Sequence, residues 1–297
     1  MHPPAPAPLL TRIVTVYRQW EFVARWADDS RLADPRVAWI FVNDAASPDD
    51  LLPPSLRGTA VGRGARFVED GVNRGRSAAR NRGAALAATP WIAHIDGDDT
   101  PLPLPEVAPF LEGGDDLVFF PFATHDDRFV PGSGGEAWTE ERVDTAVFGE
   151  LFRALGLAEP VDWRPASLLW RRDFFEQIGG YDGRCEGAED AQLVWKALGR
   201  GARTARGGGA LVSIWKGAAA GRPEQIHLTA GRLRFWEEVA RSGGTAGEIG
   251  RRAEAVQRRV AFWTLRDALV REEGPRAGWR EGAKMIWNAV TRRGPGR

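Results

Sequence analysis

Residues 91–99 read Trp-Ile-Ala-His-Ile-Asp-Gly-Asp-Asp, an apolar run that ends in three carboxylates. A short apolar run of this kind is typical of a buried β-strand. Hydrated acids gain nothing from lying at the edge of a core, so these acids carry charge that folding does not need. In an extended chain, residues two apart point to the same side. We therefore expect Asp96 and Asp98 to project together while Asp99 turns away.

The paired carboxylates predict a cation site. Two oxygens fixed side by side suit a hard divalent ion such as Mg²⁺ or Mn²⁺, and the ion can then hold a diphosphate. The alternative is an ordinary turn, because Asp-Gly is a common turn pair and acids are frequent in loops. This stretch by itself leaves both interpretations open.

Further apolar runs on both sides of residues 91–99 predict an α/β fold. Strands that alternate with helices form a mostly parallel, doubly wound sheet, and ligands gather outside the carboxyl ends of its strands. The segment 125–141 has little periodicity and is expected to be a surface loop. The expected strands are residues 12–17, 37–42, 65–69, 116–122, 167–170 and 210–214, and the expected helices are 21–27, 77–88, 172–178 and 189–198.

The last quarter of the chain has helical periodicity and predicts a helical extension, with a break at Gly243-Gly244. In the tail, an apolar stripe with a basic opposite face favours docking on the catalytic domain, and contact of residues 275–297 with an anionic membrane surface is the alternative. The expected apolar stripes are Ile226, Ala230, Leu233, Trp236 and Ala240; Ile249, Ala253, Val256, Val260 and Trp263; and Trp279, Ala283, Ile286 and Val290.

The composition excludes several classes of protein. The chain of 297 residues has 40 basic and 40 acidic side chains, and this balance argues against nucleic acid as a partner. The single cysteine, Cys185, excludes an internal disulfide and a cysteine-based zinc site. The Pro-rich residues 1–9 have no signal-peptide pattern and are expected to be disordered. We expect a cytoplasmic protein, with the inner face of the membrane as its one possible membrane contact.

Six short motifs, in this order and spacing, resemble those of a family 2 glycosyltransferase with the GT-A fold. The resemblance covers about residues 10–220, and each motif alone is weak. The motifs are Asn43-Asp44-Ala45-Ala46-Ser47, Asn73-Arg74-Gly75, Ala79-Arg80-Asn81-Arg82-Gly83, Ile95-Asp96-Gly97-Asp98-Asp99, Ile178-Gly179-Gly180-Tyr181-Asp182 and Glu189-Asp190.

The resemblance implies a set of donor-binding residues. Asp44 matches the acid that hydrogen-bonds the nucleotide base, and Arg80 matches a basic residue near the nucleotide. Asp96 is expected to contact the ribose, and Asp98, with Asp96 beside it, is expected to hold the Mg²⁺ or Mn²⁺ that bridges the diphosphate. Asn73 is placed with the donor-binding residues by its motif.

Three further residues are weaker candidates near the donor. Tyr17 stands where the family often has a Tyr-Asn pair and is expected to stack on the base. Lys216 follows an expected strand and is either a positive clamp on the diphosphate or part of a solvated loop. His227 is a candidate third metal ligand, although a lone histidine on a helix is more often structural.

The resemblance also implies an inverting mechanism with one catalytic carboxylate. Asp190 is expected to take the proton of the acceptor hydroxyl, and Glu189 is expected to position the acceptor or to replace Asp190 as the base. The alternative is that both acids only stabilise the first turn of a helix. Trp138 and Trp163 lie where an acceptor would enter and are candidate sugar platforms.

These expectations combine into a metal-dependent transferase that moves one sugar from a nucleotide donor, with a UDP-sugar expected, to a hydroxyl of a glycan, lipid-linked or small-molecule acceptor. A single transfer is expected because the Gln-x-x-Arg-Trp motif of processive members is missing from residues 232–236. A nucleotidyltransferase is the first rival, but residues 17–20 lack its Gly-rich phosphate loop. A non-catalytic nucleotide-sugar-binding or scaffold protein is the second.

The expected organisation is a glycosyltransferase domain at residues 10–222 followed by a helical extension at 223–297. Within the domain, residues of about 10–100 are expected to bind the nucleotide, and residues of about 101–222 are expected to bind the acceptor.

Overall fold

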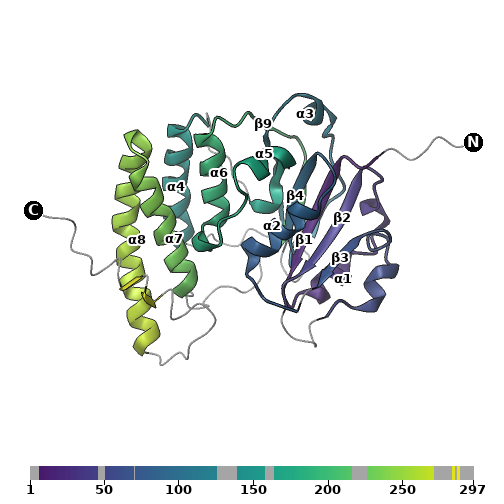
Figure 1. Cartoon of the computed structure of the whole chain (residues 1–297), viewed down its shortest axis with the longest axis horizontal. Helices are drawn as coiled ribbons and strands as arrows, with labels where there is room; N and C mark the ends of the chain where they lie inside the picture. The colour runs from purple at the N-terminus through teal and green to yellow at the C-terminus, as the bar shows by residue number, and fades with distance from the viewer. Residues whose placement is uncertain are drawn as a thin grey trace, which may run out of the picture. The chain divides into compact units, whose positions relative to one another are not determined.

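The computed structural model describes residues 7–45, 51–69, 71–125, 139–157, 164–215, 226–270, 283–284 and 286–287. The chain forms two compact units, whose helices and strands are labelled in Figure 1. Unit 1 contains Met1–Gly134, Val161–Tyr181 and Arg200–Ala219, and unit 2 contains Gly135–Pro160, Asp182–Gly199 and Ala220–Arg297.

The centre of unit 1 is a seven-stranded sheet with the strand order β3-β2-β1-β4-β8-β6-β9. The pairs β3-β2, β2-β1, β1-β4 and β6-β9 are parallel, whereas β8 runs antiparallel to both of its neighbours. The predicted mostly parallel α/β sheet is therefore confirmed. The strands are β1 (Leu10–Val16), β2 (Val37–Asn43), β3 (Arg66–Glu69), β4 (Trp91–Asp96), β6 (Leu117–Phe119), β8 (Leu168–Arg171) and β9 (Thr204–Arg206).

A second, three-stranded sheet of unit 1 has the order β5-β10-β7. It consists of β5 (Thr100–Pro101), β10 (Val212–Trp215) and β7 (Ala123–His125). Because β5 begins directly after the acidic stretch, the residues between β4 and β5 form a short connection between the two sheets. Two short helices complete this unit, α3 (Ala108–Glu112) and α5 (Arg172–Gln177).

Helices cover both faces of the main sheet, as the alternation of side chains along a strand requires. Val14 and Val16 of β1 belong to the same buried cluster as the apolar residues of α1 (Trp20–Trp26). Ile13, which points the other way, lies against Gly83 of α2 (Arg76–Leu86). The sheet is thus the middle layer between α1 and α2 (Figure 1).

The order of the strands defines where a ligand site is expected. From β1 the chain proceeds to β2 and β3 on one side, and then crosses to β4 on the other side of β1. At such a topological switch point, the connections leave neighbouring strands in opposite directions and open a crevice at the carboxyl ends. In this protein the switch point lies at the ends of β1 and β4, and β4 ends at Asp96.

Unit 2 is helical. It contains α4 (Thr139–Ala154), α6 (Glu189–Gly199), α7 (Ile226–Arg241) and α8 (Gly244–Val270), with a short 3₁₀ turn, η5, at Gly183–Cys185. α7 and α8 form an antiparallel pair joined at Gly243, and they lie side by side along most of their length (Figure 1). None of the described helices is long and apolar enough to cross a membrane.

Unit 2 differs in two details from the sequence prediction. The first stripe is buried at Ala230, Leu233 and Trp236 as expected, but Val256 of the second stripe is 52% exposed. In α8 the buried line runs instead through Gln257 and Ala261, because it follows a spacing of four residues. The expected loop at 125–141 is wrong at its end, since α4 begins at Thr139, and residues 126–138 lie outside the described part.

Part of the tail packs on the α7–α8 pair. Ile286 is fully buried in a cluster with Leu233 of α7 and Ala261 of α8, and Ala283 lies partly buried against the same cluster. The sequence favoured docking on the catalytic domain, whereas Ala283 and Ile286 pack on α7 and α8 of the helical extension itself. Trp279 and Val290 lie outside the described residues.

Candidate functional site

At the switch point, a side-chain hydrogen bond joins the ends of β1 and β4. Thr15 and Asp96 are partners in the parallel register, and the Thr15 hydroxyl donates to Asp96 Oδ1 over 3.3 Å. Both side chains point to the face covered by α2, because Ile13 of the same strand does so. The side chain of Asp96 remains 38% exposed, so its carboxylate is open to a ligand.

The acidic stretch after β4 is a turn. The backbone N–H of Asp99 donates to the carbonyl of Asp96 over 3.0 Å, as in a β-turn, and Gly97 lies against Gln19 and the backbone of Thr15. The turn interpretation and the carboxylate pair are therefore compatible. Asp96 and Asp98 are half-buried, whereas Asp99 is only 8% exposed.

Asp96 and Asp98 have pKa values that are shifted in opposite directions. Burial raises the pKa of Asp98, and the neighbouring charge of Asp96 raises it further. For Asp96, burial acts in the same direction, but the positive charges of Arg80 and Arg76 outweigh it and lower the pKa. The charge of Arg76 and a hydrogen bond from Gln19 act in the opposite direction but do not cancel the rise, so Asp98 remains short of positive charge. A cation bound to its carboxylate would lower its pKa.

Arg80 of α2 is the main partner of Asp96. Its guanidinium Nη2 lies 2.7 Å from Asp96 Oδ1 and 3.0 Å from Oδ2, and its side chain is 1% exposed. On another side, its Cζ lies 5.1 Å from the centre of the Tyr181 ring. The structure thus brings together two of the residues predicted for the donor site and adds an aromatic support beneath them.

His94 lies in the core next to this pair. It is 1% exposed, and its ring lies 5.4 Å from Phe175 and 5.1 Å from Tyr181. Burial and then the charge of Arg80 lower its pKa to about 3, so the ring is neutral at physiological pH. Its two ring nitrogens have no hydrogen-bond partner among the described residues.

Asp44 and the loop of Asn73 meet at the carboxyl end of β2. The Asp44 N–H continues the strand ladder to Val16, and Asp44 Oδ1 accepts the backbone N–H of Arg74 over 2.8 Å. Asn73 is exposed, and its Oδ1 accepts the backbone N–H of Gly75 over 3.1 Å. Asp44 therefore anchors the loop that leads into α2 and to Arg80.

Tyr17 follows β1 at the same edge of the sheet. Its side chain is 46% exposed, and the guanidinium carbon of Arg18 lies 5.4 Å from its ring centre. Arg18 has a φ of +58°, so the chain turns sharply directly after Tyr17. The site therefore includes an exposed aromatic ring.

The predicted catalytic acids belong to unit 2, in the first turn of α6. Glu189 is 3% exposed, and its Oε2 accepts the backbone N–H of Gly187 over 2.7 Å. Asp190 is half-buried, and its Oδ1 accepts the N–H of Ala191 over 2.8 Å. His227 is half-buried in the first turn of α7. Three other candidates lie outside the described residues: Trp138, Trp163 and Lys216.

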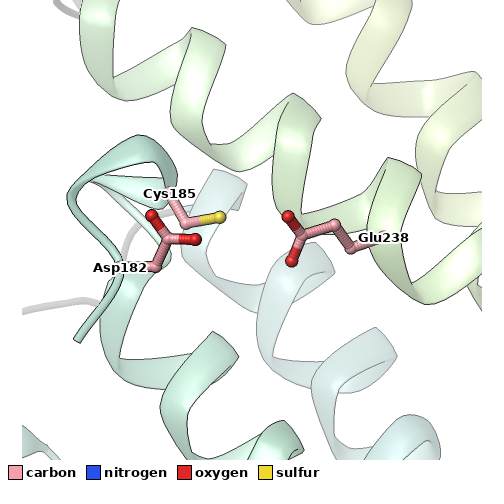
Figure 2. A group of neighbouring side chains, drawn as sticks. All are labelled: Asp182, Cys185 and Glu238. Atoms are coloured by element: carbon pink, nitrogen blue, oxygen red, sulfur yellow. The ribbon is translucent and has the colours of Figure 1, made fainter. Parts of the chain in front are cut away.

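Unit 2 also holds a group that the sequence analysis did not foresee, shown in Figure 2. Possible ligand atoms of Asp182, Cys185 and Glu238 all lie within 4.8 Å of one another. The charges are balanced, however, because Arg184 Nη2 lies 2.6 Å from Asp182 and Arg234 Nε lies 3.5 Å from Glu238.

The thiol at the centre of this group is protonated. Burial raises the pKa of Cys185 to about 12, and the charges of Glu238 and Asp182 add to this shift. The group has residue types that ligate metals, but its two carboxylates already face guanidinium groups. Asp98 does not share this balance.

The sequence analysis missed Thr15, Gln19 and Arg76 around the carboxylates. It quoted Asn81 and Tyr181 within motifs but gave them no role. One sequence feature could have indicated a role for Asn81: its amide lies in an otherwise Ala-rich and basic helix. A polar side chain in such a place usually has a specific hydrogen-bond partner.

Comparison with protein families identifies the class of this protein. The model of glycosyl transferase family 2 matches residues 11–175, which include the strands β1 to β4 and the acidic turn. The match spans more than half of the chain. The chain belongs to glycosyltransferase family 2 and is a glycosyltransferase enzyme. No curated protein sequence matches the chain significantly.

Solved structures confirm the GT-A fold. TarS from S. aureus, residues 1–349, matches with a TM-score of 0.55 and 15% identity over 95% of this chain and 81% of that chain. The mannosyltransferase PcManGT from Pyrobaculum calidifontis, in complex with GDP-Man and Mn²⁺, matches with a TM-score of 0.55 and 14% identity over 97% of this chain and 86% of that chain. TarS 1–349 in complex with UDP-GlcNAc gives a TM-score of 0.56 at 14% identity, with 95% and 81% coverage.

Proposed function

We propose that this enzyme transfers a single sugar, with inversion, from a nucleotide-sugar donor to a hydroxyl group, and that the transfer depends on a divalent cation. The observation that carries the proposal is the carboxylate pair Asp96 and Asp98 at the switch point between β1 and β4. Family membership supports the reaction class. The ligands of similar structures, UDP-GlcNAc and GDP-Man, support a nucleoside diphosphate donor.

The residues present fit an Mg²⁺ or Mn²⁺ ion. Asp98 is the first ligand in this proposal because its carboxylate is half-buried beside Asp96 with too little positive charge around it. Carboxylate oxygens are the ligands that these hard ions prefer. The bound ion would neutralise charge that grows on the leaving diphosphate. Mn²⁺ in the complex of PcManGT agrees with this assignment. His227 would be a third ligand in this proposal.

The other residues at the sheet edge would bind the rest of the donor. Tyr17 offers an exposed ring for stacking on the base, and Asp44 offers a carboxylate for its N–H groups. Asp96, held by Arg80, would accept a hydrogen bond from the ribose. Asn73 lies exposed in the loop that Asp44 anchors. We propose a UDP-sugar as the donor.

Asp190 is the proposed catalytic base. As the acceptor oxygen attacks the anomeric carbon, the Asp190 carboxylate takes the proton of the acceptor hydroxyl. The bond from the anomeric carbon to the diphosphate breaks, and its electron pair stays on the diphosphate oxygen. Asp190 suits this role better than Glu189, because Glu189 is 3% exposed whereas Asp190 is half-buried. Glu189 would then fix the start of α6 beneath the base.

The acceptor is proposed only as a class: a hydroxyl of a glycan, lipid-linked or small molecule. Trp138 and Trp163 would give it aromatic platforms, and Lys216 would contact the diphosphate. Contact of residues 275–297 with the inner membrane face stays a prediction.

A binding and turnover experiment on the full chain tests the proposal. Thermal shift with a panel of UDP- and GDP-sugars, with and without Mn²⁺, identifies the donor, since a ligand at about 100 times its Kd adds about 2.7 kcal/mol to the stability of the folded state. Asp98→Ala is expected to abolish the Mn²⁺-dependent shift. Asp190→Ala is expected to keep the shift and to lose transfer by about 10²–10⁴-fold.

The outcomes separate the alternatives. If no nucleotide sugar changes the melting temperature in the presence of Mn²⁺, the proposed function is wrong. Full transfer by Asp190→Ala would assign the base to another residue. A donor that binds tightly but is not turned over with any acceptor of a broad panel would favour the non-catalytic binding protein.

A further inference from the structure

Arg80 is held from two sides in the structure. One side is the carboxylate of Asp96, which the guanidinium Nη2 contacts at 2.7 and 3.0 Å. The other is the ring of Tyr181, whose centre lies 5.1 Å from the guanidinium carbon. Arg80 is 1% exposed and Tyr181 is 4% exposed, so both groups are withdrawn from water. A cation over an aromatic face is attracted more strongly when water is excluded.

The position of Tyr181 is itself fixed by the residue next to Arg80. The side-chain amide of Asn81 donates to the carbonyl of Tyr181 over 2.9 Å, and its oxygen accepts the N–H of Tyr181 over 2.9 Å. These two reciprocal bonds join residues that are 100 positions apart in the chain. α2 thus holds Tyr181 through Asn81 and contacts its ring through Arg80.

The segment before Tyr181 is shaped for this contact. Gly180 has a φ of +58°, and a Cβ atom on it would lie 2.5 Å from Asn81 Oδ1. Only glycine therefore allows the Asn81 amide to reach the Tyr181 backbone. The Tyr181 ring is fixed edge-on against His94, at 5.1 Å and 84°, and lies 5.7 Å from Phe175.

We propose that Tyr181 and Asn81 are positioning residues of the donor site, which hold the Arg80 guanidinium so that the Asp96 carboxylate is aimed at the bound nucleotide. The inference rests on the proposed function and deepens it. Without the ring beneath it, the long Arg80 side chain gains rotamer freedom, and Asp96 loses the partner that sets its direction. A ligand-contacting group that is not held by the residues behind it binds less tightly.

The test compares variants of the full chain in donor binding and steady-state kinetics with Mn²⁺. Tyr181→Leu is expected to raise the Kd of the nucleoside diphosphate and the donor KM about tenfold, with kcat and the acceptor KM nearly unchanged. Tyr181→Phe retains the ring face and is expected to bind the nucleoside diphosphate with the affinity of the wild type. Asn81→Leu is expected to act in the same direction as Tyr181→Leu.

Phe175→Leu is the matched control. Phe175 is 2% exposed and touches the Tyr181 and His94 rings, so its replacement removes similar aromatic packing. No described contact joins it to the Arg80 guanidinium. This variant is expected to lose stability and keep the donor KM of the wild type. An equal rise of donor KM in Phe175→Leu and Tyr181→Leu would reduce Tyr181 to a packing residue and overturn the inference.

A nucleotide-free measurement makes the test independent of substrate choice. In a double-mutant cycle of urea unfolding, Tyr181→Leu and Asp96→Asn are expected to be non-additive, because both act on Arg80. Additive effects would overturn the inference. If the wild type binds no nucleotide, the proposed function falls and this inference falls with it. If the wild type binds and Tyr181→Leu binds equally well, only this inference falls.

Discussion

Two interfaces, one in each unit, are packed in opposite ways. In unit 1, the layer between α1 and the sheet is filled by large rings: Phe41 lies 5.1 Å from Phe67, 6.3 Å from Trp26 and 6.3 Å from Trp39. In unit 2, α7 and α8 approach closely at Gly250, where a Cβ atom would lie 2.4 Å from the backbone nitrogen of Ala240. The interface between α1 and the sheet depends on large side chains, and the interface between α7 and α8 depends on a position without a side chain, so opposite substitutions should break them.

The pKa values of one acid in each unit, Asp182 and Asp98, are shifted in opposite directions. In unit 2, hydrogen bonds from Arg184 outweigh burial and lower the pKa of Asp182. In unit 1, burial and a neighbouring carboxylate raise the pKa of Asp98. The ionised form of Asp98 thus contributes nothing to stability, and acids with a raised pKa are candidates for functional sites.

Removal of the Phe41 ring should have the largest effect on stability. Phe41→Ala deletes a side chain that is 1% exposed and contacts several rings, and the resulting cavity is expected to destabilise the protein by about 4 kcal/mol. The measurement is the urea midpoint followed by circular dichroism. Leu51→Ala is the control, because Leu51 is 53% exposed and its truncation should stay within about 0.5 kcal/mol. A loss of less than about 1 kcal/mol would contradict the packing contrast.

Addition of one methyl group should be the next most harmful change. Gly250→Ala places a Cβ atom within 2.8 Å of three backbone atoms of Val239 and Ala240, which cannot move aside as a side chain can. The expected loss is about 2–3 kcal/mol, although alanine is the better helix former. Gly247→Ala is the matched control on the same helix, because its nearest atoms would be 3.4 Å away. That variant is expected to be neutral or slightly stabilising, and equal losses in both would refute the close contact.

Much of this packing was open to prediction from sequence, because it depends on local patterns. The apolar runs and their breaks predicted the strands of the parallel sheet, and apolar residues at alternating three- and four-residue spacings predicted α7 and α8. α4 was missed. Its first turn, Thr-Glu-Glu-Arg, has no apolar face, and its position depends on the stacking of Phe148 on Trp236, 4.9 Å apart. A helix that is stabilised by distant partners leaves little local signal.

In the candidate site, too, the residues within local motifs were predicted and the contacts between distant segments were not. Family motifs predicted the carboxylates and Arg80, because these residues lie within short stretches of the chain. The support behind them was not predicted, since Tyr181 reaches Arg80 from 101 positions away and only the fold makes them neighbours. Likewise, no sequence pattern relates Asp182 to Glu238. The packing of η5 on α7 brings them together.

Substitution of Asp182 and of Asp98 should change the stability of the protein in opposite directions. Asp182→Ala removes the acceptor for the N–H and guanidinium of Arg184 and is expected to cost about 1 kcal/mol. Asp98→Asn removes a carboxylate that is short of positive charge, so a gain of about 0.5 kcal/mol is expected together with loss of Mn²⁺-dependent donor binding. Thermal and urea unfolding of both variants provide the measurement, and the same sign for both changes would contradict the comparison.

The expected dependence of stability on pH follows from the pKa shifts of Asp182 and Asp98. Asp182 has a folded pKa below its ordinary value of 3.8, so its contribution is present above that pH and is lost as the pH falls through the folded pKa. The folded pKa of Asp98 lies above 3.8, so its ionised form weakens the fold at neutral pH. The gain from Asp98→Asn should therefore vanish on acidification, as protonation removes the charge from the wild type as well. A gain that persists in acid would point to a cause other than charge.

The smallest effect is expected on the reactivity of the thiol in unit 2. Cys185 is the single cysteine, it is fully buried, and its pKa of about 12 leaves a thiolate share of about one ten-thousandth at pH 8. A thiol reagent should therefore label the native protein only when this unit opens, and Gly250→Ala should speed labelling by loosening the α7–α8 pair. Fast labelling of the native wild type would contradict the closed group in Figure 2.

Addition of divalent cations to the thiol-labelling experiment tests the difference between Asp98 and the acids Asp182 and Glu238. Because Arg184 and Arg234 balance the charges of Asp182 and Glu238, Mn²⁺ or Zn²⁺ should leave the labelling rate of Gly250→Ala unchanged. The same ions should still raise the melting temperature of the wild type with a nucleotide donor through Asp98. If an ion instead protects the thiol, the Asp182, Cys185 and Glu238 group binds metal despite its arginines. The unmatched charge of Asp98 would then no longer distinguish the metal-binding acids from the structural ones.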